Sequence, residues 1–289
     1  MVARSALGRV GVWNHELWTD DPSREGAVRD AVAEVESLGF GAVWLGGSPP
    51  PAAAGLALSA TDRLVVATGI TNIWNTTPAE AATQAADLAA NYPGRFILGL
   101  GAGHGQATPQ YHRPYATMVE YLDALDAAPT PVPPGGRVLA ALGPRMLRLA
   151  AQRSAGAHPY MIPLEHTARA RQLLGPQPLL APEVNVVLDG DPHTARQAAR
   201  NHIRRYLTLT NYTDNFKRFG FTDDDIAHGG SDRLIDALYL WGDPDRIRAR
   251  AQEFYQAGAD HLAVQVIPTI PAAEPTARYR GLAAVLIQA

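Results

Sequence analysis

One stretch combines three glycines with a histidine at the end of an apolar run. Residues 95–104 read RFILGLGAGH, so Gly99, Gly101 and Gly103 lie within or just after the run, and His104 follows at once. A short apolar run of this kind is typical of a buried parallel strand. Glycine lets the backbone approach a flat ligand closely, and an imidazole with a pKa of about 6.5 can transfer protons at neutral pH. The pattern indicates proton transfer beside a planar ligand; the alternative is a tight turn with a solvated histidine.

Other residues with chemical potential follow apolar runs elsewhere in the chain. Asn14 and His15 come after the first run, and Glu16 is the one carboxylate near these positions. A glycosidase needs two carboxylates, so that class is not favoured. His15 and His104 could meet but lack a third ligand, so we expect no metal site. The aromatic, amide and glycine residues at the run ends instead suit a planar heteroaromatic cofactor.

A phosphate-bearing cofactor would also find donors at a helix start. The residues from Gly143 to Met146 follow an apolar run and open a helical pattern, which presents free backbone N–H groups to an anion. The alternative for Arg145 is an exposed helix face. Likewise, Trp13, Trp44 and Trp74 can be packing residues inside the fold rather than walls of a cofactor site.

Composition restricts the class of protein. The chain has 289 residues, 46% of them hydrophobic and 18% charged, which predicts a large core. The net charge of −3 does not favour nucleic acid or an anionic membrane as a partner. There is no cysteine, which excludes thiolate catalysis and disulfides, and Lys217 is the only lysine. No run is long and apolar enough to cross a membrane, so we expect a cytoplasmic protein. We expect its partner to be a small-molecule substrate.

The elements that would position these residues alternate between strands and helices. Eight strands are expected at 9–13, 42–45, 64–70, 96–100, 137–142, 156–162, 183–188 and 260–267. Such alternation predicts a single (β/α)8 barrel domain over residues 1–289, with its site at the carboxyl ends of the strands. The competitor is a doubly wound open sheet, but the turn after its first strand would carry glycines, and here it reads Asn14-His15-Glu16. Residues 211–230 break the alternation and predict a helical insertion before the last strand.

Several motifs in order resemble one known family. They are ATGI at 67–70, LGLGAG at 98–103, LAALGPRML at 139–147, AGAHPY at 155–160, WGDP at 241–244 and AGADH at 257–261. Together they resemble the bacterial luciferase-like flavin- and deazaflavin-dependent oxidoreductases, and more narrowly the actinobacterial branch that uses coenzyme F420. The resemblance covers nearly the whole chain and implies the luciferase-like version of the barrel, with homodimerisation as a family expectation.

The resemblance also implies a cofactor bed. In this family a non-prolyl cis peptide bond at the end of the third strand lies behind the central ring of the cofactor, and the matching bond here is Gly69–Ile70. Asn72, Ala102 and Gly103 would complete the bed of the ring.

The rest of the cofactor would lie against later strand ends. The residues that match the site of the phosphate-bearing tail are Leu142, Gly143, Arg145 and Met146. Tyr160 falls at a position that lines the site.

Three departures from the family bear on the substrate. Sugar-phosphate dehydrogenases of this family carry an Asp-His pair where this chain has Gly46-Gly47, and a glutamate where it has His104. They also carry lysines for the substrate phosphate, and this chain has none to match. Glucose 6-phosphate is therefore not expected as a substrate.

The resulting hypothesis is hydride transfer between coenzyme F420 and an apolar or aromatic carbonyl, imine or activated alkene. His104 is the expected general acid or base, with His15 and Asn14 as further candidates. Two alternatives stay open: an FMN-dependent monooxygenase of the same fold, and a non-catalytic protein that binds the deazaflavin or flavin.

Overall fold

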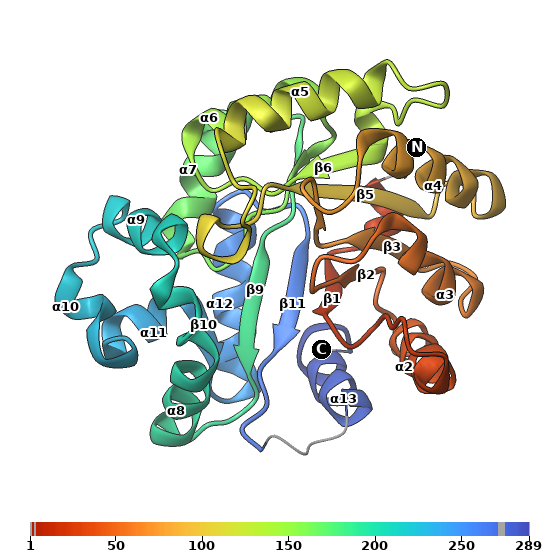
Figure 1. Cartoon of the computed structure of the whole chain (residues 1–289). Helices are drawn as coiled ribbons and strands as arrows, with labels where there is room; N and C mark the ends of the chain where they lie inside the picture. The colour runs from red at the N-terminus through yellow and green to blue at the C-terminus, as the bar shows by residue number, and fades with distance from the viewer. Residues whose placement is uncertain (1, 3, 271–274, 289) are drawn as a thin grey trace.

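The computed structural model describes residues 2, 4–270 and 275–288 and places a curved sheet at the centre of the molecule, with helices outside it (Figure 1). Every strand pairing among these residues is parallel. The strands are β1 (Val10–Asn14), β2 (Ala42–Leu45), β3 (Val65–Thr68), β4 (Thr71–Asn72), β5 (Phe96–Gly101), β6 (Arg137–Leu139), β7 (Gly156–Ala157), β8 (Leu179–Leu180), β9 (Glu183–Val187), β10 (Tyr239–Trp241) and β11 (Leu262–Val266).

Each of the eight expected strands is present, as β1, β2, β3, β5, β6, β7, β9 and β11. Three short strands were not expected. β4 continues the path of β3 and pairs with β5, β8 precedes β9, and β10 pairs with β9. Strands of two or three residues carry too little periodicity to be separated from loops by sequence.

The sheet closes into a barrel through one segment, residues 179–187. At its start, β8 pairs with β7, and the amide of Ala181 donates to the carbonyl of Ala157. At its end, β9 pairs with β11, and the amide of Ile267 donates to the carbonyl of Val186. The segment therefore joins the two ends of the sheet, and the (β/α)8 barrel predicted from the alternation is confirmed.

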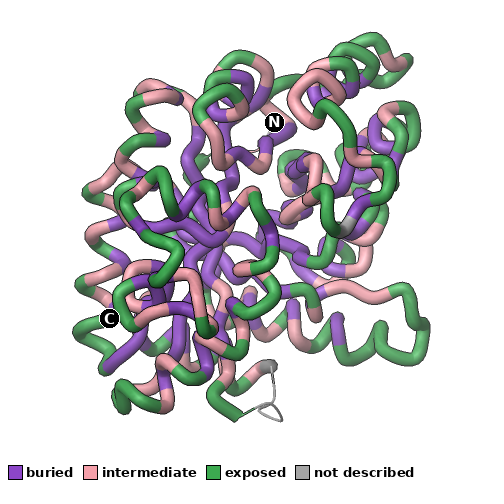
Figure 2. The backbone as a smooth tube through the Cα atoms, turned by 60° about the vertical axis from the view of Figure 1, so that its left-hand side comes forward, coloured by how far each residue is buried: buried purple, intermediate pink, exposed green. Residues whose placement is uncertain are grey.

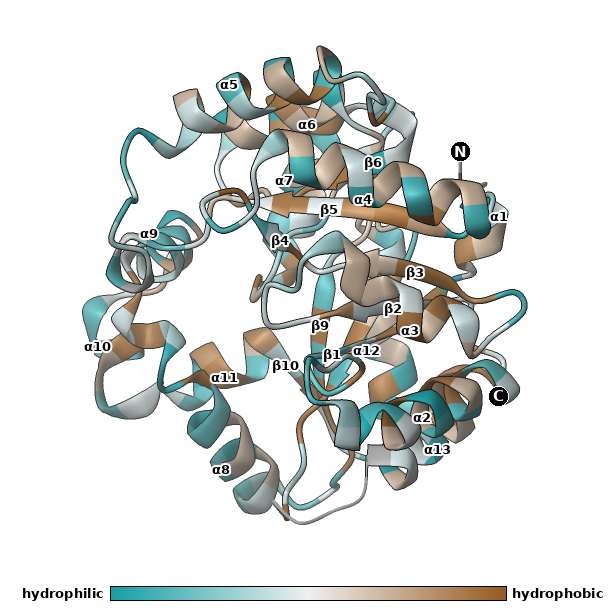
Figure 3. Ribbon diagram, turned by 45° about the vertical axis from the view of Figure 1, so that its right-hand side comes forward, coloured by the Kyte–Doolittle hydropathy of each residue, from teal (hydrophilic) through white to brown (hydrophobic). Residues whose placement is uncertain are grey.

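Helices cover the outside of the barrel. They are α1 (Arg4–Leu7), α2 (Glu25–Ser37), α3 (Ala54–Ser59), α4 (Pro78–Asn91), α5 (Pro114–Asp126), α6 (Pro144–Arg153), α7 (Leu164–Leu174), α8 (Pro192–Ile203), α9 (Thr210–Arg218), α10 (Asp223–Ile226), α11 (Asp232–Leu238), α12 (Pro244–Gln256) and α13 (Pro275–Leu286). Side-chain caps followed by proline begin α4, α8 and α12, at Thr77, Asp191 and Asp243. Polar residues lie on the outward sides of α2 and α5, whereas β3 and β5 are mostly apolar (Figure 3). No helix among the described residues is both long and apolar enough to span a bilayer.

The barrel interior is filled rather than hollow, and buried residues follow the strands through the middle of the molecule (Figure 2). Trp44 is fully buried there, stacks on His158 with 4.2 Å between ring centroids, and donates from Nε1 to Nε2 of His261 at 3.0 Å. Trp44 is therefore a packing residue. His158 donates from Nδ1 to the carbonyl of Ala181 at 2.7 Å, which fixes its ring inside the barrel.

The helical insertion is confirmed and forms a separate hydrophobic cluster. It runs from the 3-10 turn η5 (Tyr206–Thr208) through α9 and α10 to α11, and lies on the side of β9 and β10 in Figure 1. Phe216, Leu234 and Ile235 are buried at its centre and do not belong to the main core. The insertion brings side chains from 206–219 over the carboxyl ends of the strands, where the site was predicted.

Candidate active site

Trp13 forms the floor of the predicted ring bed. It is the last residue but one of β1, is buried, and donates from Nε1 to the carbonyl oxygen of Gly69 at 3.1 Å. The Gly69–Ile70 peptide bond is cis, as the resemblance implied. A Cβ atom at position 46 would lie 2.4 Å from the Trp13 ring, so the indole fills the space where a side chain of residue 46 would stand. Gly46 thus has a packing reason.

The glycines within β5 make room for the neighbouring segment of the chain, residues 68–70, rather than for a ligand. A Cβ at Gly99 would lie 1.9 Å from the carbonyl oxygen of Thr68, and one at Gly101 would lie 2.6 Å from Cδ1 of Ile70. The sequence-based explanation, close approach of a flat ligand, is therefore not needed at these two positions. Gly103 differs, because its φ of +63° is a left-handed conformation that favours glycine.

Asn72 and Ala102 shape the loop that follows β4 and β5. The side-chain oxygen of Asn72 accepts from the amide of Trp74 at 3.0 Å, and Trp74 donates from Nε1 to the carbonyl of Ala102 at 2.6 Å. Asn72 is buried, and its amide nitrogen would lie 2.9 Å from a Cβ at Gly103. These three predicted bed residues, Asn72, Ala102 and Gly103, are therefore neighbours.

His104 is half-buried between β5 and the insertion. Asn211 of α9 places Nδ2 3.3 Å from Nδ1 of His104 and 3.4 Å from the carbonyl oxygen of Gly103. Because a carbonyl only accepts, Asn211 must donate, so Nδ1 of His104 is the acceptor and Nε2 carries the proton of the neutral ring. Burial, together with the positive charge of Arg205, lowers the pKa of His104 below its usual 6.5.

Four aromatic side chains gather above the barrel. Tyr160 packs against Trp13 with 5.2 Å between ring centroids and against Tyr206 with 5.4 Å, and the two tyrosine hydroxyl oxygens lie 2.7 Å apart. Tyr212 lies 4.9 Å from the ring of His104 and 6.1 Å from that of Tyr160, so it links the two predicted site residues. Burial raises the pKa of Tyr160 well above 10, which keeps its hydroxyl protonated.

Sequence reasoning missed Tyr206, Asn211 and Tyr212, which all come from the insertion. The break in the alternation at 211–230 was the available signal. It showed that extra chain was present, but it could not show that this chain folds back over His104 and Tyr160.

A polar chain continues from Tyr160 towards α8. Tyr160 donates to Oε1 of Gln265 at 3.1 Å, and Nε2 of Gln265 lies 3.4 Å from Nε2 of His202. His202 in turn places Nδ1 2.8 Å from the hydroxyl of Tyr239. Burial lowers the pKa of His202 to about 4, so the ring is neutral at pH 7.

Glu183 is a buried acid inside the barrel. It is 1% exposed, and its Oε2 accepts from the amide of Met161 at 3.3 Å and from Nδ2 of Asn185 at 3.2 Å. Burial raises the pKa of Glu183 to about 8, because neither contact offsets the loss of water around the carboxylate. Glu183 is therefore protonated at neutral pH.

Asn14 and His15 lie at the end of β1 but in different environments. Asn14 is buried, donates to the hydroxyl of Tyr279 at 2.8 Å and accepts from the amide of Glu16 at 2.9 Å. Its amide is thus engaged in holding the turn after β1. His15 is exposed and lines a cavity of about 640 Å³ next to β11 and α8.

A second cavity, of about 340 Å³, lies at the start of α6. Its lining comprises Leu142, Pro144, Leu147, His166, Arg169, Leu173, Asn215, Arg218 and Phe219. His166 donates from Nε2 to the carbonyl of Leu142 at 2.9 Å, and its buried Nδ1 has no partner among the described residues. Both polar side-chain atoms of Asn215 are also buried, and nothing in the described part of the chain pairs with them. Burial, helped by the charge of Arg218, lowers the pKa of His166 to about 4.

This second cavity fits the polyol and phosphate part of a flavin or deazaflavin. The unpaired atoms of His166 and Asn215 can bond hydroxyl groups, and the guanidinium groups of Arg169 and Arg218 can face a phosphate. Gly143, the N-cap of α6, has no side-chain cap, so the first amides of the helix remain available to an anion.

The residues predicted for the tail are brought only partly together. Leu142 lines the second cavity, and a Cβ at Gly143 would lie 4.0 Å from the guanidinium of Arg218. Arg145 instead is exposed and lies over the ring of Tyr115, 4.1 Å from its centroid. Met146 is half-buried against the main core.

Across the described part of the chain, no cluster of three or more histidine, aspartate or glutamate side chains is arranged to hold a metal ion.

Comparison with known proteins gives the family. The model of the luciferase-like monooxygenase family matches residues 12–261. No curated protein matches the chain. The chain is similar to a solved F420-dependent secondary alcohol dehydrogenase in complex with an F420-acetone adduct, with 16% identity, 96% of this chain and 98% of that chain covered, and a TM-score of 0.72.

Two further solved structures show the same fold. Coenzyme F420-dependent tetrahydromethanopterin reductase from Methanopyrus kandleri is 16% identical, with 97% and 98% coverage and a TM-score of 0.69. The oxygenating constituent of 3,6-diketocamphane monooxygenase from Pseudomonas putida, in complex with FMN, is also 16% identical, with 97% and 98% coverage and a TM-score of 0.67. The chain therefore belongs to the luciferase-like monooxygenase family and has its luciferase-like barrel fold.

Proposed function

We propose that this protein is an oxidoreductase that transfers hydride between coenzyme F420 and an apolar or aromatic carbonyl, imine or activated alkene. The observation that carries the proposal is the second cavity, near the start of α6. Buried atoms of Asn215 and His166 that have no partner among the described residues lie there beside two arginines. Such a set suits a ribityl phosphate chain, and the resemblance of the sequence motifs favours F420 among the cofactors that carry one.

We assign the residues of the site as follows. The ring of the cofactor would lie against Gly69, Ile70, Asn72, Ala102 and Gly103, with Tyr160 at its side, and the tail against Leu142 and Gly143 and the backbone of Arg145 and Met146. His104, with His15 and Asn14 as further candidates, would face the substrate. When bound, the deazaflavin supplies or accepts the hydride, and the protein supplies position and protons.

His104 has the protonation chemistry that the reaction needs. At neutral pH its Nε2–H can donate a hydrogen bond to a carbonyl oxygen, since Asn211 occupies Nδ1. The imidazolium form can also deliver a proton to that oxygen, and its lowered pKa makes it a stronger acid than an exposed histidine. Trp13, Tyr160, Tyr206 and Tyr212 give the surroundings the aromatic character expected for an apolar or aromatic reacting group.

An FMN-dependent monooxygenase is the second candidate. Arg169 and Arg218 together would suit the doubly charged phosphate of FMN, and one similar structure holds FMN. A non-catalytic binding protein is the third candidate, since the Asp-His pair of the sugar-phosphate dehydrogenases is replaced here by Gly46-Gly47.

The three candidates separate in one pair of assays. Reduced F420 is mixed anaerobically with a panel of aromatic aldehydes, ketones and enones, and the return of oxidised-F420 fluorescence is followed; reduced FMN is then tested in an oxygen electrode. We expect substrate-dependent oxidation of reduced F420. Oxygen uptake with reduced FMN and oxygenation of the substrate would support the monooxygenase, and tight binding without turnover would support the non-catalytic protein.

We extend the proposal to the assembly and location of the protein. The family resemblance supports a single catalytic domain over 1–289 and a homodimer. The sequence without cysteine supports a cytoplasmic location. Sedimentation of the purified protein and fractionation of expressing cells test the last two.

A further inference from the structure

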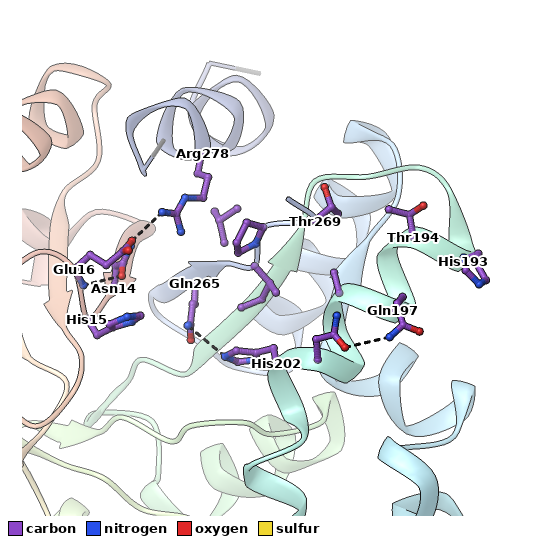
Figure 4. A pocket seen from close by; sticks show the side chains of 15 residues that line it. Asn14, His15, Glu16, His193, Thr194, Gln197, His202, Gln265, Thr269 and Arg278 are labelled. Atoms are coloured by element: carbon purple, nitrogen blue, oxygen red, sulfur yellow. Dashed lines mark hydrogen bonds and ion pairs between the residues drawn. The ribbon is translucent and has the colours of Figure 1, made fainter. Parts of the chain in front are cut away.

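The larger cavity, of about 640 Å³, lies beside the predicted ring bed and is lined by many polar side chains together with the apolar residues Ala198, Val266, Ile267 and Pro268 (Figure 4). It is bounded by the turn after β1, the end of β11, one face of α8 and the start of α13. Eleven of its fifteen lining residues are polar: Asn14, His15, Glu16, His193, Thr194, Gln197, Asn201, His202, Gln265, Thr269 and Arg278. Its volume falls within the range of ordinary small-molecule sites.

The formal charges of the lining cancel. Glu16 and Arg278 point toward each other in Figure 4 and form an ion pair at 2.8 Å. The guanidinium is thereby neutralised, so the cavity offers no excess charge to a carboxylate or phosphate. The buried Nε of Arg278 has no partner among the described residues and remains a donor for a neutral acceptor.

The remaining polar groups both donate and accept. Gln197 donates from Nε2 to Oδ1 of Asn201 at 3.1 Å, which leaves the oxygen of Gln197 and the amide nitrogen of Asn201 for a ligand. His15 and His193 each offer one donor and one acceptor nitrogen when neutral. Hydroxyl groups also donate and accept, so a hydroxylated molecule can satisfy this lining, whereas an apolar one would leave it unpaired.

Gln265 joins this cavity to the predicted ring bed. Its side chain lines the cavity and accepts a hydrogen bond from Tyr160, whose ring packs on Trp13 over Gly69. A molecule whose reacting group lies among these aromatic rings could therefore place its other end in the cavity.

We propose that the larger cavity binds an uncharged, polyhydroxylated group, a glycosyl or polyol unit, which forms the non-reacting part of the substrate. The claim that this molecule is the substrate rests on the proposed function. The claim that the cavity binds such a group is independent of it. The substrate class is then an aromatic or unsaturated carbonyl compound joined to a neutral polyol.

Binding of three matched aldehydes tests this, measured by calorimetry on the protein without and with saturating F420. The probes are 4-formylphenyl β-D-glucoside, 4-carboxybenzaldehyde and 4-butylbenzaldehyde. We expect the glucoside to bind at least tenfold more tightly than the other two. Gln197→Leu and Asn201→Leu should each weaken the glucoside about tenfold and leave the other two unchanged, whereas Gln152→Leu on α6, outside the cavity, should change none.

Equal or weaker binding of the glucoside, or binding that does not respond to either cavity variant, would overturn the proposal. The outcome is separate from that of the proposed function. A glucoside that binds through Gln197 and Asn201 to a protein that takes no hydride from F420 would keep the cavity assignment and reject the function; turnover of the aldehydes without preference for the glucoside would do the reverse.

Discussion

His104 is held in one tautomer by a residue of the insertion. Asn211 donates both to its Nδ1 and to the carbonyl of Gly103, so the orientation of the ring depends on α9 as well as on β5. The sequence could identify His104 as a titratable group at a strand end. It could not identify Asn211, because the partner is 107 residues away in the chain.

The first prediction concerns the pH dependence of turnover. Because the pKa of His104 is lowered, the imidazolium form is populated only below pH 6.5, and the rate of carbonyl reduction should rise as the pH falls through that range. His104→Ala should lower kcat about 100-fold, flatten this rise and leave the Kd for F420 within twofold. His112→Ala, an exposed histidine on the same loop, is the control. An unchanged pH profile in His104→Ala would remove His104 from proton transfer.

The second prediction concerns the arginines of the smaller cavity. Arg218→Gln and Arg169→Gln should each raise the Kd for F420 about tenfold, since each removes a charge-assisted contact worth roughly 1.4 kcal/mol. Lys217→Gln is the matched control, because Lys217 neighbours Arg218 but pairs with Asp223 and does not line the cavity. If fluorescence titrations show that Lys217→Gln and Arg218→Gln raise the Kd for F420 equally, Arg218 makes no direct contact with the cofactor and acts only through its net charge.

At the scale of the element, the glycine pattern of β5 has a different cause from the one that the sequence suggested. The glycines of 99–103 correctly marked a strand end with unusual backbone contacts. The contacts at Gly99 and Gly101 are made by Thr68 and Ile70 of the neighbouring segment. A sequence shows that a side chain is absent but not what occupies its place, so ligand and neighbouring strand could not be distinguished.

The third prediction follows from that close approach. Gly99→Ala should lower the free energy of unfolding by at least about 2 kcal/mol, because the added Cβ would overlap the carbonyl oxygen of Thr68. Gly26→Ala is the matched control, since nothing lies within 4 Å of its Cβ position in α2 and alanine favours a helix. It should be neutral or stabilising by up to about 1 kcal/mol. Urea unfolding measures both, and a Gly99→Ala protein as stable as the wild type would contradict the packing of β5 on β3.

For the whole molecule, the sequence predicted the order of the strands but not which segments lie over the site. The eight main strands and the caps at Thr77, Asp191 and Asp243 follow from local patterns, which carry their own information. The closure at 179–187 and the position of α9 depend on contacts between distant segments. No local pattern contains them, and they decide how Tyr206 and Tyr212 surround Tyr160.

The fourth prediction concerns stability against pH. Burial lowers the pKa values of four histidines to about 4: His158, His166, His202 and His261. Below pH 6.5 the unfolded chain therefore binds more protons than the folded chain, and the free energy of unfolding decreases as the pH is lowered. Glu183 acts in the opposite sense, because its pKa of about 8 makes the folded state bind the extra proton between pH 4.5 and 8. Below pH 6.5 the effect of the four histidines on the free energy of unfolding is larger than that of Glu183, so stability decreases as the pH is lowered. Above pH 6.5 the effect of Glu183 remains, and stability decreases as the pH is raised.

The melting temperature should therefore be highest near pH 6.5–7 and lower by about 5 °C or more at pH 5. It should also decline by roughly 2–4 °C between pH 7 and 8, and Glu183→Gln should abolish that alkaline decline while keeping the contacts of Oε2. Calorimetric scans across this range give the profile. A decline above pH 7 that persists in Glu183→Gln would show that another group causes it.

The central claim is that the carboxyl end of this barrel binds a deazaflavin, with its tail in the smaller cavity. Parallel fluorescence titrations of the purified protein with oxidised F420 and with FMN test it most directly. The account predicts micromolar binding of F420, much weaker binding of FMN, and loss of F420 affinity in Arg218→Gln. Preference for FMN, or binding of neither cofactor, would contradict it.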